Sequence, residues 1–304
     1  MDRFQAINAF VAVVEHGSFA RAAERLDQSV SAVSRHVAEL EQHLDARLLN
    51  RTTRRLSLTE AGRAFHERSV QLLADLQEAE QAAGGGTAAP RGTLKLSCPI
   101  TYGTRVLAPM LAAFVARYED VRLDVELSDR MVDLVDEGFD VAVRIGAIRS
   151  PLLVARRLTS TALVCCASPG YLSRLGTPRT PEELASHACL TYEFAPQRFQ
   201  WRFSTPAGEE RVVRAGGPLH SNNGRMLVAL AVAGAGIAYE PDFIVAPDIA
   251  AGRLVPILTD WNLPSMPISA VYPSRRHLSA KVRAFVDFLV ERLGTVGSGS
   301  PAMG

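Results

Sequence analysis

The chain has 304 residues, enough for about two domains, and 33 Lys plus Arg against 32 Asp plus Glu leave a formal net charge of +1. This balance argues against a protein that coats nucleic acid by bulk charge, and 47% apolar residues exclude wholesale disorder. Four cysteines are too few for a disulfide framework or a zinc ribbon. The polar N-terminus and the short apolar stretch at 226–239 predict neither a signal peptide nor a membrane span, so we expect a cytoplasmic protein.

Three helices are predicted first. Apolar residues recur at helical spacing from Phe4 to Val14, and the first helix is expected to end at Gly17. Ser18 is a suitable N-cap for a short second helix that ends before a turn at 27–28. Ser29 caps a third helix, whose expected buried stripe is Val30, Val33, Val37, Leu40 and Leu44. Two short helices joined by a tight turn are typical of a helix-turn-helix.

A basic segment follows the third helix. Residues 46–58 include Arg47, Arg51, Arg54 and Arg55 and no acidic residue, and their alternating pattern predicts a small hairpin, or wing. Cations without counter-charges repel one another unless an anion is near, which favours DNA as the partner. The alternative is an ordinary three-helix cluster with a solvated face.

A long helix is predicted to begin at Thr59. Its apolar and small residues recur at spacings of four and three, which is typical of a coiled-coil seam between two subunits. The seam consists of Phe65, Ser69, Leu72, Leu76, Ala79 and Ala83. Glycines at 84–86 then predict a hinge.

From residue 92 onward, strands and helices alternate, which predicts an α/β domain with a mostly parallel sheet. Strands are expected at 94–98, 121–127, 140–145, 163–167 and 237–239, and helices at 107–118, 132–137, 226–233 and from Ser279 onward. Residues 294–304 are expected to form a tail without a core.

Several runs of residues, in order and spacing, resemble LysR-type transcriptional regulators. In the first part they are Ala22-Ala23-Glu24-Arg25-Leu26, Ser31-Ala32-Val33-Ser34-Arg35, Leu40-Glu41, Arg47-Leu48-Leu49-Asn50-Arg51-Thr52-Thr53-Arg54-Arg55 and Leu58-Thr59-Glu60-Ala61-Gly62. Later ones are Tyr118-Glu119-Asp120-Val121, Asp140-Val141-Ala142-Val143-Arg144-Ile145-Gly146, Cys165-Cys166-Ala167-Ser168-Pro169 and Gly234-Ala235-Gly236-Ile237-Ala238. The resemblance covers nearly the whole chain up to the tail.

The resemblance implies a winged helix-turn-helix, a linker helix and a periplasmic-binding-protein-like α/β effector domain of two subdomains. We expect a DNA-binding domain at 1–58, a dimerising linker helix and hinge at 59–91, an effector-binding domain at 92–294 and a flexible tail at 295–304. Subdomain I would comprise about 92–163 and 268–294, and subdomain II about 164–267. Two strands would cross between them, near Leu163 and near 268–271.

The DNA contacts are expected at the start of the third helix and on the wing. Arginine can form two hydrogen bonds to guanine, and serine or threonine can contact bases or phosphates. The candidate residues are Ser29, Val30, Ser31, Ser34, Arg35, Arg51, Thr52, Arg54 and Arg55. Val30 stands where the family often has Gln or Pro, so it either contacts a thymine methyl group or packs in the core. Asp45 stands where the family usually has Gly, at the left-handed C-cap of the third helix.

Effector contacts are expected where loops lead into helix N-termini, whose N–H groups favour an anion. The candidates are Ile100, Thr101, Tyr102, Ser128, Arg144, Asn222 and Asn223, with Arg149 as a second possible counter-charge. Thr101, Ser128 and Asn222 have helix capping as the alternative role. Tyr102 and Trp201 would line the site or pack in the core.

The expected partners are double-stranded DNA with an interrupted palindrome, a small organic anion, and further copies of the chain in a dimer or tetramer, with RNA polymerase as a candidate. No catalytic residue, metal site, cofactor or membrane contact is expected. The rival classes are a binding protein or enzyme with an accessory helical bundle, and a thiol switch through Cys98. The peroxide-sensing branch of the family is disfavoured because 197–208 contains no cysteine.

Overall fold

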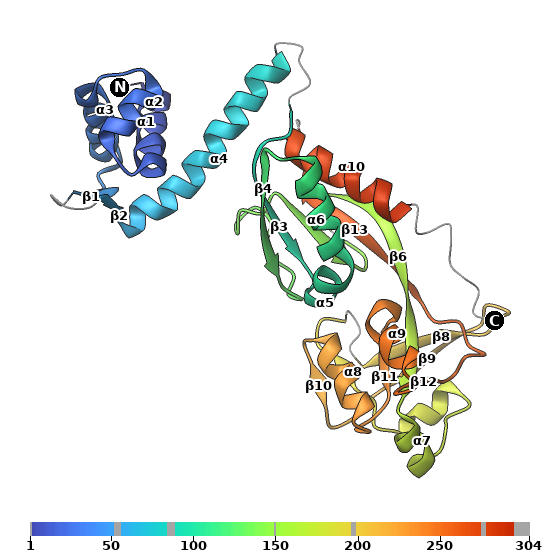
Figure 1. Cartoon of the computed structure of the whole chain (residues 1–304). Helices are drawn as coiled ribbons and strands as arrows, with labels where there is room; N and C mark the ends of the chain where they lie inside the picture. The colour runs from blue at the N-terminus through green and yellow to red at the C-terminus, as the bar shows by residue number, and fades with distance from the viewer. Residues whose placement is uncertain are drawn as a thin grey trace. The chain divides into compact units, whose positions relative to one another are not determined.

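The computed structural model describes residues 2–51, 56–83, 89–148, 150–195, 199–274 and 278–294. Thr52, Arg54, Arg55, Arg149 and the tail at 295–304 therefore lie outside the described residues. Contacts along the chain divide it into two units, Met1–Ala89 and Pro90–Gly304 (Figure 1).

The first unit contains the three predicted helices, the predicted hairpin and the predicted long helix. Its elements are α1 (Arg3–His16), α2 (Phe19–Leu26), α3 (Val30–Leu44), β1 (Leu49–Arg51), β2 (Leu56–Leu58) and α4 (Glu60–Ala83). Ser29 accepts a hydrogen bond from the backbone N–H of Ala32, as expected of an N-cap. Asp45 ends α3 with φ of 47°, which confirms that it adopts the left-handed cap conformation.

The core of the first unit lies between the first three helices. Phe10, Val33 and Val37 are fully buried and Leu40 nearly so. The prediction that Val30 and Leu44 belong to the buried stripe is wrong, since they are 49% and 36% exposed. They occupy the first and last turns of α3, so the helices that cover its middle leave both ends open to solvent.

Side chains hold the hairpin and α4 in place. The Glu41 carboxylate accepts hydrogen bonds from the backbone N–H groups of Leu48 and Leu49 at 2.8 and 3.0 Å. Thr59 caps α4 through the N–H of Gly62 and donates its hydroxyl to the carbonyl of Arg47. A Cβ on Gly62 would lie 1.9 Å from the carbonyl oxygen of Leu48, so only glycine permits this close approach.

The second unit is built on a mixed sheet with the strand order β11-β6-β13-β5-β3-β4, and β12 also pairs with β6. Its strands are β3 (Gly92–Cys98), β4 (Val121–Leu127), β5 (Val141–Ile145), β6 (Leu153–Ala167), β11 (Ala238–Pro241), β12 (Val255–Pro256) and β13 (Ser265–Pro273). Smaller sheets comprise β7 (Thr191–Tyr192) with β10 (His220–Ser221), and β8 (Gln200–Ser204) with β9 (Glu210–Arg214).

Helices cover these sheets. They are α5 (Ile100–Tyr102), the π-helical turn Gly103–Leu107, α6 (Ala108–Arg117), α7 (Pro169–Leu175), the 3₁₀-helix Pro181–Ser186, α8 (Gly224–Val232), α9 (Asp242–Ala250) and α10 (Ala280–Gly294). Within the described residues, no helix is long and apolar enough to cross a bilayer.

The prediction of a mostly parallel sheet is wrong, because β6 pairs antiparallel with β11, β12 and β13, and in the described sheet only the pairs of β3 are parallel. β3 runs parallel to β4 and β5, whereas β13 runs antiparallel to both of its neighbours, β5 and β6. β13 returns from the second half of the unit and inserts between two strands that run the other way. Sequence periodicity does not reveal such an insertion because it depends on long-range pairing.

β6 runs through two subdomains (Figure 1). Its residues up to Ala162 pair with β13, and from Leu163 onward they pair with β11, so the predicted crossing near Leu163 is confirmed. The returning strand crosses at Ser265, and residues 268–271 already pair with β5. Subdomain I here means β3 to β5, β13, α5, α6 and α10; subdomain II means α7 to β12.

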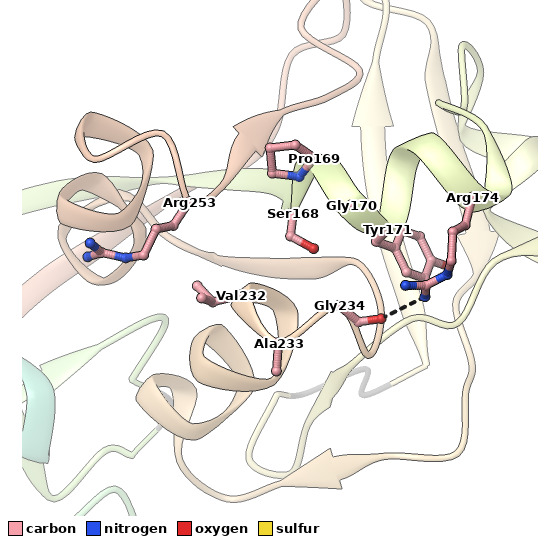
Figure 2. A pocket seen from close by; sticks show the side chains of 9 residues that line it. All are labelled: Ser168, Pro169, Gly170, Tyr171, Arg174, Val232, Ala233, Gly234 and Arg253. Atoms are coloured by element: carbon pink, nitrogen blue, oxygen red, sulfur yellow. Dashed lines mark hydrogen bonds between the residues drawn. The ribbon is translucent and has the colours of Figure 1, made fainter.

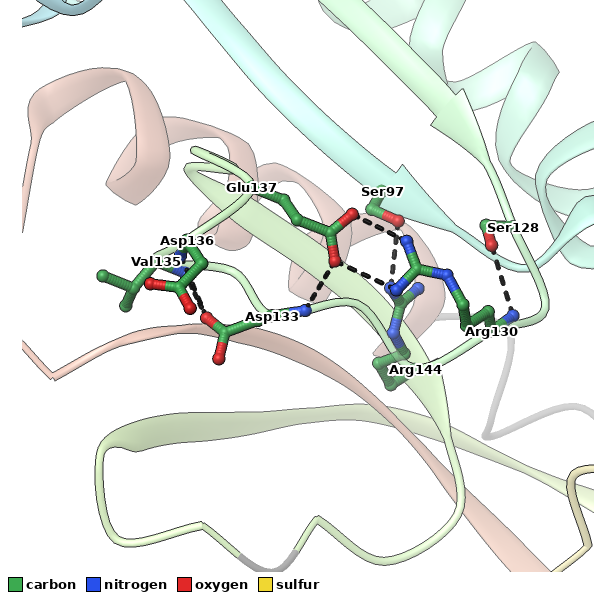
Figure 3. Close-up of polar contacts among 8 residues, drawn as sticks. All are labelled: Ser97, Ser128, Arg130, Asp133, Val135, Asp136, Glu137 and Arg144. Atoms are coloured by element: carbon green, nitrogen blue, oxygen red, sulfur yellow. Dashed lines mark hydrogen bonds and ion pairs between the residues drawn. The ribbon is translucent and has the colours of Figure 1, made fainter.

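The predicted helix at 132–137 is wrong, because this segment forms turns. The Asp133 carboxylate accepts hydrogen bonds from the N–H groups of Val135 and Asp136, and the Glu137 carboxylate accepts one from the N–H of Asp133 (Figure 3). These side chains satisfy the donors locally, which is how Asp competes with helix formation.

Candidate functional site

The start of α3 presents the predicted DNA-reading residues to solvent. Ser29, Val30, Ser31 and Arg35 are exposed, and Ser34 is half-buried. The hydroxyls of Ser29 and Ser31 lie 3.0 Å apart and form a hydrogen bond. The exposure of Val30 favours the reading in which its methyl groups face outward over the one in which it packs in the core.

The wing is described only in its paired part. Arg51 ends β1 opposite Leu56, and the hairpin is antiparallel. The side chain of Arg51 and the residues Thr52, Arg54 and Arg55 lie outside what the structure describes, so their phosphate contacts stay predictions.

The predicted seam of α4 divides into two parts. Ser69 is buried, and the Phe65 ring lies 5.8 Å from the Phe10 ring, so this end packs within its own unit. Leu72 is 46% exposed. Leu72 is therefore the seam residue that we expect to contact a second α4 helix.

The predicted loop at 99–103 is the beginning of a helix. Ile100 is partly exposed, whereas Thr101 and Tyr102 are 7% and 2% exposed. The Tyr102 ring packs edge-on against Phe243 with 5.2 Å between centroids, and burial raises its pKa. Trp201 is buried as well and stacks on Tyr239 at 4.8 Å, so it packs in the core of subdomain II.

The two subdomains meet at Asp129 and Asn223, which we call the junction. One Asp129 oxygen accepts the N–H of Ile100 at 3.0 Å, and the other accepts the side-chain amide of Asn223 at 3.1 Å. Asn223 also caps α8 by accepting the N–H of Met226. Asn222 is exposed, and no hydrogen bond to another described residue places it at the junction. Sequence reasoning did not select Asp129, although Asp directly after a strand in a candidate loop is a usable signal.

Ser128 and Arg144 lie where strands of subdomain I end (Figure 3). Ser128 accepts the N–H of Arg130, which makes it a turn residue. The guanidinium of Arg144 donates to the Ser97 hydroxyl at 2.9 Å and to the carbonyl of Val143 at 3.0 Å.

Arg144 is a cation without a paired carboxylate. It is 5% exposed, burial lowers its pKa, and it forms no ion pair with any described residue. The nearby Glu137 is engaged by Arg130 in a two-bond ion pair at 2.7 and 3.1 Å, which lowers the pKa of Glu137 (Figure 3). A buried charge of this kind is costly unless another group compensates it.

Subdomain II contains a buried acidic side chain, Glu240, which was not among the residues predicted from the sequence. It is 3% exposed, and its Oε1 has no hydrogen-bond partner among the described residues. Burial, with a smaller contribution from Asp129, raises its pKa to about 8. Its Oε2 lies against α8, where a Cβ on Gly224 would be only 2.5 Å away.

The cysteines show no sign of a reactive thiol. Cys98 is fully buried, and burial raises its pKa to about 11, so it remains a thiol at neutral pH. Cys165 and Cys166 belong to different apolar clusters, as expected of neighbours on opposite faces of a strand. These surroundings argue against a thiol switch at Cys98.

The fold and these surfaces define a regulator with one DNA-binding part and one small-molecule-binding part. The family model for the bacterial regulatory helix-turn-helix protein, lysR family, matches residues 4–63, and the LysR substrate binding domain matches residues 87–294. The chain belongs to the LysR family of transcriptional regulators.

Relatives of known name agree with this assignment. The chain is 38% identical to an HTH-type transcriptional repressor of Pseudomonas aeruginosa, over 96% of this chain and 92% of that protein. It is similar to the solved structure of CrgA, a LysR-type regulator from Neisseria meningitidis, with 37% identity, a TM-score of 0.60, and 95% and 98% of the two chains covered. AphB, a virulence activator of Vibrio cholerae, shares 30% identity at a TM-score of 0.59, over 94% of this chain and 98% of that one.

Proposed function

We propose that this LysR-type regulator responds to a small organic anion that binds where β3, β4 and β5 end, facing the start of α8. The observation that carries the proposal is Arg144, a buried guanidinium that donates to a hydroxyl and a carbonyl and forms no ion pair with any described residue. The carboxyl ends of parallel strands are a common position for ligand sites. An anion there would neutralise Arg144 and reach the junction.

The anion would act through the junction. The Asp129 carboxylate accepts the N–H of Ile100 at the start of α5 in subdomain I and the side-chain amide of Asn223 in subdomain II. A ligand beside Asp129 and Asn223 would therefore contact both subdomains. A ligand changes the arrangement only through its different affinity for the two states. We propose that this changed arrangement alters how paired DNA-binding units engage an interrupted palindrome.

For DNA binding, we propose that α3 contacts the bases and that the wing contacts the phosphates. The roles of Ser29, Val30, Ser31 and Arg35 follow from their exposure at the start of α3, and the half-buried Ser34 lies beside them. Pairing through the α4 seam would bring two such units to one operator, and further association would form a tetramer. RNA polymerase is the candidate downstream partner, in the cytoplasm.

We also propose the domain division expected from the sequence, with DNA binding at 1–58, linker and hinge at 59–91 and effector binding at 92–294. No catalytic role is proposed. The two solved relatives and the Pseudomonas relative are named as regulators, and the thiol at Cys98 is buried in its neutral form.

A thermal-shift screen of small carboxylates on the full chain, at constant ionic strength, tests the proposal. A specific ligand raises the melting temperature by mass action. The shift should shrink in Arg144→Gln and persist in the exposed control Arg122→Gln. Thr101→Val provides a second variant if Arg144→Gln does not fold. A carboxylate that shifts all variants equally would contradict the assigned site.

A further inference from the structure

A cavity of about 290 Å³ lies in subdomain II, away from the junction (Figure 2). Its walls are the beginning of α7 and the turn after α8, with Ser168, Arg174 and Gly234 among the lining residues. α8 has nine residues and so spans about 13 Å. Asn223 caps one end of this helix and the cavity lies at the other, so the two places are separate.

Ser168 supplies a hydroxyl to this cavity. The residue is 6% exposed, and although it precedes α7, its side chain makes no capping hydrogen bond. Among the described residues its hydroxyl has no partner. Figure 2 shows the hydroxyl pointing into the space beside Gly234. A bound oxygen acceptor would give this hydroxyl the hydrogen-bond partner that the described chain does not supply.

Arg174 brings an unneutralised cation to the same point. Its guanidinium donates to the carbonyl of Gly234 at 3.2 Å and forms no ion pair within the described chain. A Cβ built on Gly234 would lie 3.6 Å from Ser168 Oγ and 3.7 Å from Arg174 Nη1. The hydroxyl and the guanidinium therefore converge on one position.

The charge on the opposite wall is also positive. Arg253 lines the cavity with its stem, while its guanidinium binds Asp248 at 2.7 Å. Asp248 pairs with Arg225 as well, so one carboxylate serves two arginines. The surroundings of the cavity therefore carry an excess of positive charge.

We propose that this cavity is a second ligand site, which binds the oxyanion group of a small molecule, a carboxylate or a phosphate. Arg174 and Ser168 donate hydrogen bonds to its oxygens. The cavity volume is close to the lower end of small-molecule sites, which are roughly 300 Å³ and above, so the ligand is small. This site does not depend on the anion proposed for the junction.

Isothermal titration of the full chain with inorganic phosphate and with acetate, at matched ionic strength with chloride, tests the proposal. We expect saturable binding of at least one probe. Arg174→Gln should weaken it about ten-fold, as expected for loss of a charged hydrogen bond, and Ser168→Ala should weaken it less. Which probe binds more tightly distinguishes a phosphate ligand from a carboxylate.

The control is Arg214→Gln, which removes an exposed arginine of subdomain II that does not line the cavity. It should bind the probe as the unaltered chain does. In an Arg144→Gln background, which removes the anion site proposed at the junction, Arg174→Gln should still weaken the remaining binding. No binding of either probe beyond chloride would overturn the proposal. So would equal losses in Arg174→Gln and Arg214→Gln, because binding would then follow overall charge.

Discussion

The exposed face of α3 and the buried junction region use arginine in opposite surroundings. Arg35 lies on the surface, where water solvates its charge until a partner arrives. Arg144 is 5% exposed and depends on Ser97 and Val143 for its hydrogen bonds. The difference shows that an exposed charge needs no partner other than water, whereas a buried charge is costly unless hydrogen bonds or an opposite charge compensate it.

Among the predicted changes, the largest is expected for the pH dependence of stability, at the buried carboxyl of Glu240. Its pKa of about 8 in the folded protein exceeds the usual 4.5, so its contribution to stability is lost as pH rises between these values. Each pKa unit corresponds to about 1.4 kcal/mol. Glu240→Gln should therefore gain stability relative to the unaltered chain as pH rises from about 4.5 to 8.

Urea unfolding at a series of pH values measures this effect. The control is Glu119→Gln, an exposed carboxylate. Its difference from the unaltered chain should stay nearly constant with pH. A Glu240→Gln difference that is equally constant would show that Glu240 is solvated in solution, and would weaken the contrast between the two regions.

The next effect concerns the exposed side, at Leu72. If two α4 helices pair through this residue, Leu72→Glu should separate the subunits and lower operator affinity about a hundred-fold, because each unit then binds one half-site alone. Sedimentation and operator titration measure both changes. Leu152→Glu, at a leucine that is 73% exposed in the second unit, should leave the assembly intact. An undisturbed dimer in Leu72→Glu would refute the seam.

Arg35→Ala should weaken operator binding by ten-fold or more, since a two-bond contact to a base contributes about 1–3 kcal/mol. Binding to unrelated DNA should fall much less. Competition titration with operator and random duplexes distinguishes these effects. Equal losses on both would assign Arg35 to phosphate contact, and the α3 face would then resemble the wing.

The smallest effect is expected on the wing. Arg55→Ala should reduce the slope of log affinity against log salt by about 0.9, the value for one lost phosphate contact. Operator titration at several salt concentrations measures the slope, with Arg122→Gln in the second unit as the control. If the slope does not change, Arg55 makes no phosphate contact.

How much could be predicted from sequence differs between these regions. The helices of the first unit, the cap at Ser29 and the hairpin after α3 follow from local spacing and capping, and the structure confirms them. The prediction that Val30 is buried was wrong. Periodicity shows which face of a helix a residue occupies, but it does not show where the helices that cover this face end. The helix predicted at 132–137 failed because Asp133 and Glu137 bond to nearby N–H groups.

The sequence by itself determined the family, the order of the elements and the candidate DNA-reading face, because caps, periodicity and motif spacing are properties of neighbouring residues. Its net charge of +1 concealed a basic segment that lacks acids. Only the tertiary structure decided that β13 inserts between β5 and β6 and that Asp129 and Asn223 meet. It also decided that Arg144 and Glu240 are buried, with no ion pair to another described residue. Burial and pairing across the sheet depend on residues far apart in the chain, so no local pattern contains them.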